Sequence, residues 1–247
     1  MPFSKQTLDF LIENRLHDSR EWFGQHKNSY NRFVITPFKE LVAALTPTML
    51  KLDDQFTTEP RVDRTISRVW RDTRYSHDPA LYRDNMWLIF KRGDRMHGSD
   101  YPGCYFEISA QGFVYGCGFY HASTGYMNTL RSLVLAEDPA FSAAQKAFSR
   151  QKVFVMEGEC YKRPHFADKP PAQSQWLERR NISFNARCTD FDLLFSDHLA
   201  EHLIAGFQKL APIYRFLLHA ATQELQNQAA RNAQQARGID PHDMDWD

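Results

Sequence analysis

Residues 104–118 constrain the fold of this chain more than any other segment, because two alternating runs flank a very short turn. The runs 104–109 and 112–118 are rich in aromatic and β-branched residues, and Ala110-Gln111 separates them. This pattern predicts a β-hairpin whose register is fixed by a two-residue loop. The register pairs Ser109 with Gly112, Phe106 with Tyr115, Tyr105 with Gly116, and Cys104 with Cys117.

The two faces of this hairpin differ in character. One face carries Phe106 and Tyr115 and is expected to lie in an aromatic core, in a chain that has 19 Phe. The other face carries Tyr105 and Glu107 beside Gly116. A glycine inside a strand often marks close approach by a ligand or another backbone, so this face is a candidate surface. Cys104 and Cys117 are expected to stay reduced, and a three-residue loop would shift their pairing.

The rest of the chain alternates helix and strand signals. Helical spacing is seen over 4–16 with Ser4 as N-cap, from Ser19 through Leu45, over 127–134, and over 191–210, where Pro212 is expected to break the helix. Strands are expected at 86–90, 153–156 and 180–187, the last two separated by a loop region with Pro164, Pro170 and Pro171. The run 65–70 favours strand over helix, although Arg64, Arg68, Arg71 and Tyr75 would share one helical face.

These elements predict an α+β fold with N-terminal helices, a mainly antiparallel sheet with a central hairpin, and a long C-terminal helix. Residues 1–226 are expected to form a single domain. Residues 227–247 are polar, nearly devoid of large apolar side chains, and are expected to form a tail of frayed helix followed by disorder.

Charge and composition exclude some functional classes. Net charge is +0 and the pI is about 7.2, which argues against broad nucleic-acid binding. No apolar signal segment and no run of ~20 apolar residues is evident, so we expect a cytoplasmic protein without a membrane partner. Site-specific binding of single strands through Tyr105, Tyr115 and Tyr120 is a less favoured alternative.

Against this neutral background, residues 61–95 form a basic segment. It contains eight Arg and Lys91 against five Asp, an excess of four positive charges. Arginine forks match carboxylate and phosphate oxygens in pairs, so the segment predicts either an anion site or an internal salt-bridge network. In the first case Arg68, Arg71 and Arg74 would bind the anion; in the second Asp72 and Asp78 would neutralise them.

Geometry bears on this choice. Residues i and i+2 share a strand face while i and i+3 do not, so Arg68 and Arg71 converge only if the strand ends near Trp70. The excess of arginines over local acids favours the anion site slightly. His26-Lys27 could add basic groups to the same site.

Signals for catalysis are weaker. Asp72 with Asp78 or Glu107 could form a carboxylate pair, and His77 or His97 could supply a proton. His198 and His202 have the i, i+4 spacing of two metal ligands, but no third ligand is evident. The sequence has no nucleophile elbow, phosphate loop or dinucleotide fingerprint. We therefore assign no catalytic residue, metal or cofactor.

The basic segment also resembles a known family. Arg68-x-x-Arg71-Asp72-x-Arg74-Tyr75, with Asp78 and Tyr82 downstream, is similar to the signature Arg-x-x-Arg-Asp-x-Arg-Phe, Asp-Lys, Tyr of a widespread bacterial and fungal family catalogued as a domain of unknown function. The runs 22–30 and 116–120, the latter leading to Leu130-Arg131, resemble the same family. Pro79 replaces the expected lysine, and Tyr75 replaces phenylalanine.

The resemblance covers roughly the first 135 residues and implies a shared site without an activity. The ligand-binding residues expected from the basic segment and the resemblance are Arg68, Arg71, Asp72, Arg74, Tyr75, Asp78, Tyr82, Arg83 and Arg131.

Two functions remain open on the sequence alone. The first is binding, with turnover left open, of a small phosphorylated or carboxylated ligand at the Arg/Asp/Tyr cluster. The second is a non-catalytic protein-interaction module in which the same cluster is structural.

Overall fold

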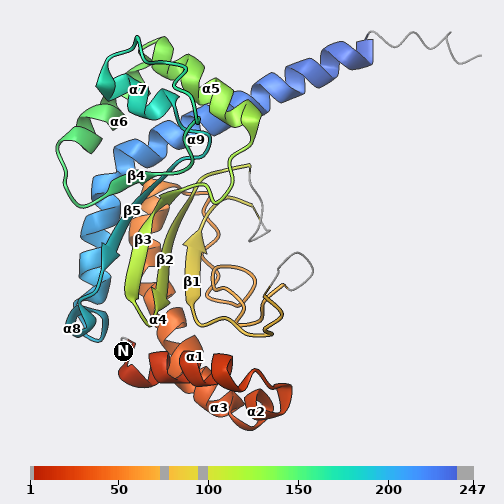
Figure 1. The fold of residues 1–247 in the computed structure, drawn as a ribbon, viewed down its shortest axis with the longest axis vertical. Helices are drawn as coiled ribbons and strands as arrows, with labels where there is room; N and C mark the ends of the chain where they lie inside the picture. Colours follow the sequence, from red (N-terminus) through yellow and green to blue (C-terminus); the bar gives the residue numbers. More distant parts are fainter. Residues whose placement is uncertain (1–2, 73–77, 94–99, 238–247) are drawn as a thin grey trace, which may run out of the picture.

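The computed structural model describes residues 3–72, 78–93 and 100–237. It contains one five-stranded sheet in the order β1-β2-β3-β5-β4, with every neighbouring pair antiparallel. The strands are β1 (Met86–Phe90), β2 (Gly103–Ser109), β3 (Gly112–Gly118), β4 (Val155–Glu157) and β5 (Ser183–Cys188). The predicted α+β class, central hairpin and long C-terminal helix are confirmed (Figure 1).

The central hairpin has the predicted register. Ser109 pairs with Gly112, Phe106 with Tyr115, and Cys104 with Cys117. Both cysteines are buried and free. Burial raises the pKa of both thiols, which keeps them protonated.

The helices cover one face and both ends of the sheet. α9 packs against β3 and α4 packs against β1, while α5 and α6 pack on the middle of α9 (Figure 1). The helices are α1 (Lys5–His17), α2 (Arg20–Gln25), α3 (Lys27–Tyr30), the π-helical turn η1 (Asn31–Ile35), α4 (Thr36–Leu52), α5 (Thr124–Leu135), α6 (Pro139–Ser149), α7 (Pro171–Leu177), α8 (Phe191–Leu194) and α9 (Leu199–Arg237).

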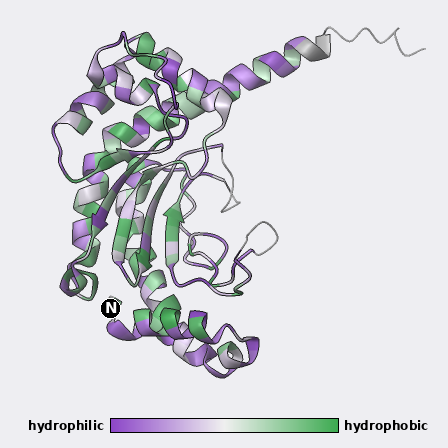
Figure 2. Cartoon of the chain, in the orientation of Figure 1, coloured by the Kyte–Doolittle hydropathy of each residue, from purple (hydrophilic) through white to green (hydrophobic). Residues whose placement is uncertain are grey.

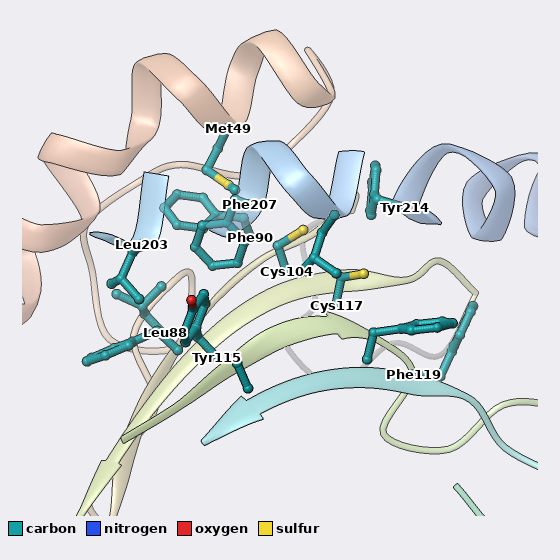
Figure 3. Packing of buried hydrophobic residues seen from close by; sticks show 14 of the residues in the cluster. Met49, Leu88, Phe90, Cys104, Tyr115, Cys117, Phe119, Leu203, Phe207 and Tyr214 are labelled. Atoms are coloured by element: carbon teal, nitrogen blue, oxygen red, sulfur yellow. The ribbon is translucent and has the colours of Figure 1, made fainter. Parts of the chain in front are cut away.

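The main core lies between the sheet and the helices α4 and α9. Figure 3 shows Tyr115 and Cys117 of β3 facing Leu203 and Phe207 of α9. Met49 of α4 reaches the same cluster. Hydrophobic residues concentrate on these elements, whereas the projecting end of α9 is largely hydrophilic (Figure 2).

The C-terminal helix differs from its expected course. Pro212 does not break it, because α9 continues through the proline as one helix of 39 residues. Residues 227–237, where frayed helix is expected from the sequence, are the last three turns of the same helix.

Two other segments also differ from expectation. The proline-rich region after Pro164 is not all loop, since Pro171 begins α7. Residues 65–70 make isolated bridges, Ile66 with Leu88 and Trp70 with Tyr82, without forming a regular strand.

Residues 27–52 form a continuous helical segment through α3, η1 and α4. By length and composition alone it could cross a membrane, but the core helix of a soluble protein passes the same test. Phe38, Val42 and Leu45 on this segment are fully buried within the protein core. The segment therefore has a packing role in the fold.

Candidate functional site

The basic segment folds back on itself beside the β1 edge of the sheet. Arg71 N–H donates to Leu81 O at 2.8 Å, and Arg83 N–H donates to Val69 O at 2.9 Å. These bonds flank the Trp70–Tyr82 bridge and make a short antiparallel ribbon. Because side chains alternate along such a ribbon, Arg71 and Arg83 share one face and Trp70 and Tyr82 share the other.

Asp78 precedes the second strand of this ribbon and contacts two of the arginines. Its Oδ2 accepts from Arg15 of α1 at 2.7 Å and lies 3.0 Å from Arg71. The hydrogen bond from Ala80 N–H, followed by Arg15 and Arg71, holds the pKa of Asp78 below its ordinary value. One ionised carboxylate therefore serves two guanidinium groups.

Arg83 has a different environment. Its guanidinium carbon lies 4.7 Å from the Trp87 ring centre, and its Nε is buried without a hydrogen-bond partner among the described residues. Within the same residues it makes no ion pair. Burial and the neighbouring Arg71 and Arg68 lower its pKa, against opposing contributions from Glu107 and Tyr120. Arg83 is thus a half-buried cation next to other cations.

Arg68 lies on the opposite side of the ribbon from Arg71. Its Nε is 2.6 Å from Asp63, and both side chains are about half exposed. Arg68 also lines a pocket of about 430 Å³ together with Trp70 and Phe23. Arg15, Arg68, Arg71 and Arg83 are called the arginine cluster below.

Tyr82 anchors the ribbon rather than facing solvent. Its ring is fully buried, 4.2 Å from Trp70 and 5.3 Å from Phe23 between centroids. Its hydroxyl makes no hydrogen bond within the described part of the chain. The Tyr82 and Leu81 amides donate to Asp18 Oδ1 at 3.2 and 2.7 Å, so α1 and the ribbon are joined through backbone as well as side chains.

The remaining predicted site residues are placed as follows. Asp72 is exposed and follows Arg71 directly. Arg74, Tyr75 and His77 lie outside the described residues. Arg131 is not brought to the cluster: its guanidinium donates to the backbone oxygens of Leu177 and Arg179 and to Asn128 Oδ1.

The structure also explains why a glycine stands at position 116 in the central hairpin. Tyr105, Gly116 and Asn185 lie in one cross-strand row, and the Tyr105 hydroxyl donates to Asn185 Oδ1 at 2.7 Å over the glycine. A Cβ at position 116 would stand 2.7 Å from that oxygen. Asn185 Nδ2 donates on to Glu157, which pairs with Arg187. The groups that approach Gly116 are therefore the backbone oxygen of Phe184 and the side chain of Asn185.

The candidate metal spacing of His198 and His202, at the start of α9, does not bring further ligands together. His202 Nε2 lies 3.2 Å from the Tyr115 hydroxyl, and His198 Nδ1 lies 3.3 Å from Glu201 Oε2. Burial lowers the pKa of His202. In the described ranges, no group of three or more His, Cys, Asp or Glu side chains could hold a metal ion.

Sequence reasoning missed two members of this region. Arg15 and Asp18 belong to α1 and its C-cap, yet they contact the ribbon more than 60 residues later. Nothing in the local pattern of α1 distinguishes them from solvated helix residues. The sequence signal that does exist is at Asp18, which adopts a left-handed backbone with φ of 46°, a conformation that Asp tolerates better than most residues.

The fold and this region together define an α+β protein with an arginine-rich ribbon docked between an N-terminal helical layer and the edge of an antiparallel sheet. The chain belongs to the family described as Conserved hypothetical protein (DUF2461), which matches residues 6–216. The match extends well beyond the first 135 residues that carry the resemblance in the sequence. No curated protein and no solved structure matches the chain.

Proposed function

We propose that this protein binds a small anionic ligand, phosphorylated or carboxylated, at the arginine cluster. The observation that carries this proposal is Arg83, a half-buried guanidinium with no ion pair among the described residues. A buried charge is costly unless it is paired. An anion bound beside Arg83 and Arg71 would supply the missing charge and accept from arginine donors.

The surrounding charges support the same proposal. Two carboxylates of this region are engaged with other arginines, because Asp78 contacts Arg15 and Arg71, and Asp63 contacts Arg68. Burial and the neighbouring Arg71 lower the pKa of Arg83, so binding of an anion would relieve a repulsion that the unliganded site contains.

The test is a thermal-shift and calorimetry series with pyrophosphate and citrate on wild type, Arg83→Gln and Arg83→Lys. A ligand at a hundred times its Kd stabilises a protein by ~2.7 kcal/mol, which raises the Tm of a chain of this size by several degrees. We expect the shift in wild type, a reduced shift in Arg83→Lys and none in Arg83→Gln. Arg180→Gln, which removes an exposed arginine 3.5 Å from Glu159, is the matched control and should behave as wild type.

Either of two results would overturn the proposal: no anion shifts the wild type, or Arg83→Gln shifts as much as Arg180→Gln. Added NaCl should weaken binding, because exposed parts of the site are screened.

The alternative is a non-catalytic protein-interaction module in which the cluster is structural. The Arg15–Asp78 and Asp18–ribbon contacts favour it, since they join α1 to the ribbon without any ligand. Leu16, 78% exposed on α1, and Ile12, 36% exposed, offer apolar surface nearby. This alternative predicts that Leu16→Ser abolishes capture of a protein partner while anions have no effect on Tm.

A further inference from the structure

The pocket beside Arg68 has aromatic walls and a polar mouth. Its volume of about 430 Å³ lies within the range of small-molecule sites. Phe23, Tyr30 and Trp70 form the aromatic walls. Lys27, Asn31 and Arg68 supply most of the polar groups, and all three are exposed.

The three rings are arranged as walls rather than as a closed stack. Phe23 and Tyr30 are 5.2 Å apart at 60°, and Phe23 and Trp70 are 5.4 Å apart at 65°. Rings that meet at such angles contact one another edge to face, which leaves other parts of their surfaces uncovered. Phe23 and Trp70 are also only partly buried, so ring surface remains open to the pocket.

The mouth of the pocket carries cationic groups with unused donors. Lys27 makes no ion pair within the described residues, and the two terminal nitrogens of Arg68 make no hydrogen bond there. Asp63 is a counter-charge at the same mouth, but it is paired with Arg68 Nε at 2.6 Å. With Lys27 included, the mouth has a net positive charge.

The helix geometry places two of these groups together. Lys27 begins α3 and Asn31 begins the π-helical turn η1. Residues four apart lie on one helical face, so both side chains reach the same pocket. π-Helical turns are rare and occur frequently at functional sites.

We infer that this pocket is a second anion site, which takes a ligand whose phosphate or carboxylate is carried on a flat aromatic or heteroaromatic ring, with the ring lying against the open surfaces of Phe23 and Trp70 and the anion at Lys27 and Arg68. The site lies on the other side of the ribbon from Arg71 and Arg83, so it is distinct from the proposed anion site and goes beyond the proposed function. A ring stacked on an aromatic side chain typically strengthens binding by about 5- to 150-fold.

The experiment uses three matched phosphate probes and one carboxylate: methyl phosphate, phenyl phosphate, adenosine monophosphate and benzoate. Isothermal titration of the full chain measures each Kd. We expect phenyl phosphate to bind at least tenfold more tightly than methyl phosphate. Adenosine monophosphate against phenyl phosphate separates a nucleotide from a simpler aryl phosphate, and benzoate separates carboxylate from phosphate.

Variants of the pocket test which residues contact the ring of the ligand and which contact its anion. Trp70→Leu should bring phenyl phosphate down to the affinity of methyl phosphate while leaving methyl phosphate unchanged. Lys27→Gln, at an exposed position, should weaken all probes together. Tyr161→Leu is the aromatic control, because Tyr161 stacks on His165 and does not line the pocket.

The outcomes separate this inference from the proposed function. Equal affinity of methyl and phenyl phosphate in wild type would overturn the ring inference and leave anion binding standing. Binding of no probe would also overturn the inference, whereas the pyrophosphate series with Arg83→Gln tests the proposed function separately. Trp70 also packs on Tyr82, so if Trp70→Leu does not fold, saturation-transfer NMR on wild type replaces it: transfer to the phenyl protons supports the inference, and absence of transfer overturns it.

Discussion

At the scale of single residues, Asp53 is the clearest example of a buried charge that is fully satisfied. Its side chain has no exposed area, and Oδ2 accepts from Arg92 Nε at 2.7 Å and from the Tyr214 hydroxyl at 2.5 Å. Burial alone would raise the pKa of Asp53, but these bonds, with the Gln55 amide, lower it below its ordinary value of 3.8. The carboxylate is therefore more stable in the folded protein than in the unfolded chain.

A lowered folded pKa fixes the sign of the pH dependence. The contribution of Asp53 to the free energy of unfolding is complete above pH 3.8 and is lost as pH falls through the lower folded pKa. Asp53→Asn should cost about 3–5 kcal/mol at pH 7, since it leaves the Arg92 charge without its partner. Urea unfolding should show this difference shrinking at pH 3 and below. Asp54→Asn, at the exposed neighbour, is the control; an equal Asp53→Asn deficit at pH 7 and at the lowest pH would contradict the prediction.

At the scale of elements, the hairpin is predictable because its register depends on neighbouring residues and on loop length. The spacing of apolar residues does not predict helices α6 and α7, although the sequence contains residues that are typical of a helix start. Asp138 is the N-cap of α6 and its side chain accepts from the Ala140 N–H, while Pro139 begins α6 and Pro171 begins α7. Proline is favourable at the first helical position, so a proline-rich stretch does not by itself indicate a loop. Pro212 is a break signal that tertiary structure overrides, because Ile213, Tyr214 and Phe216 are fully buried and their packing keeps α9 continuous.

The sheet itself gives the next prediction. Gly116→Ala would bring a Cβ against the backbone oxygen of Phe184 and within 2.7 Å of Asn185 Oδ1, so β3 and β5 would have to separate and the Tyr105–Asn185 bond would lengthen. We expect a loss of about 2–3 kcal/mol in the free energy of unfolding. Chemical denaturation measures it.

Gly24→Ala is the matched control for this substitution. Gly24 lies within α2 and a Cβ there meets nothing within 4 Å, so alanine should stabilise the protein by about 0.5–1 kcal/mol. Equal effects of the two substitutions would show that the crowding at Gly116 does not matter to the sheet.

At the scale of the whole molecule, the candidate site depends on contacts that no local pattern reveals. The basic composition of residues 61–95 is visible in the sequence, and so is the opposition of Arg68 and Arg71 across a strand. The contact of Asp78 with Arg15 is not visible in the sequence, because it requires α1 to dock on a ribbon 63 residues away. Arg131 is misleading for a related reason: a buried arginine can satisfy its donors with backbone oxygens as well as with an anion.

Docking of α1 on the ribbon gives the last prediction. Asp18 Oδ1 accepts two ribbon amides, those of Leu81 and Tyr82, and Asp18 itself needs a left-handed backbone. Asp18→Ala removes the acceptor and favours another backbone conformation, so the free energy of unfolding should fall by about 2 kcal/mol. Hydrogen exchange at the two amides should accelerate, and pyrophosphate binding should weaken as Arg15 and Asp78 lose their alignment. Asp18→Asn keeps an acceptor oxygen and tolerates the left-handed backbone, so it should resemble wild type in both measurements. Unchanged exchange in Asp18→Ala would mean that the N-terminal helices hold the ribbon by apolar packing alone, and that the arginine cluster forms independently of α1.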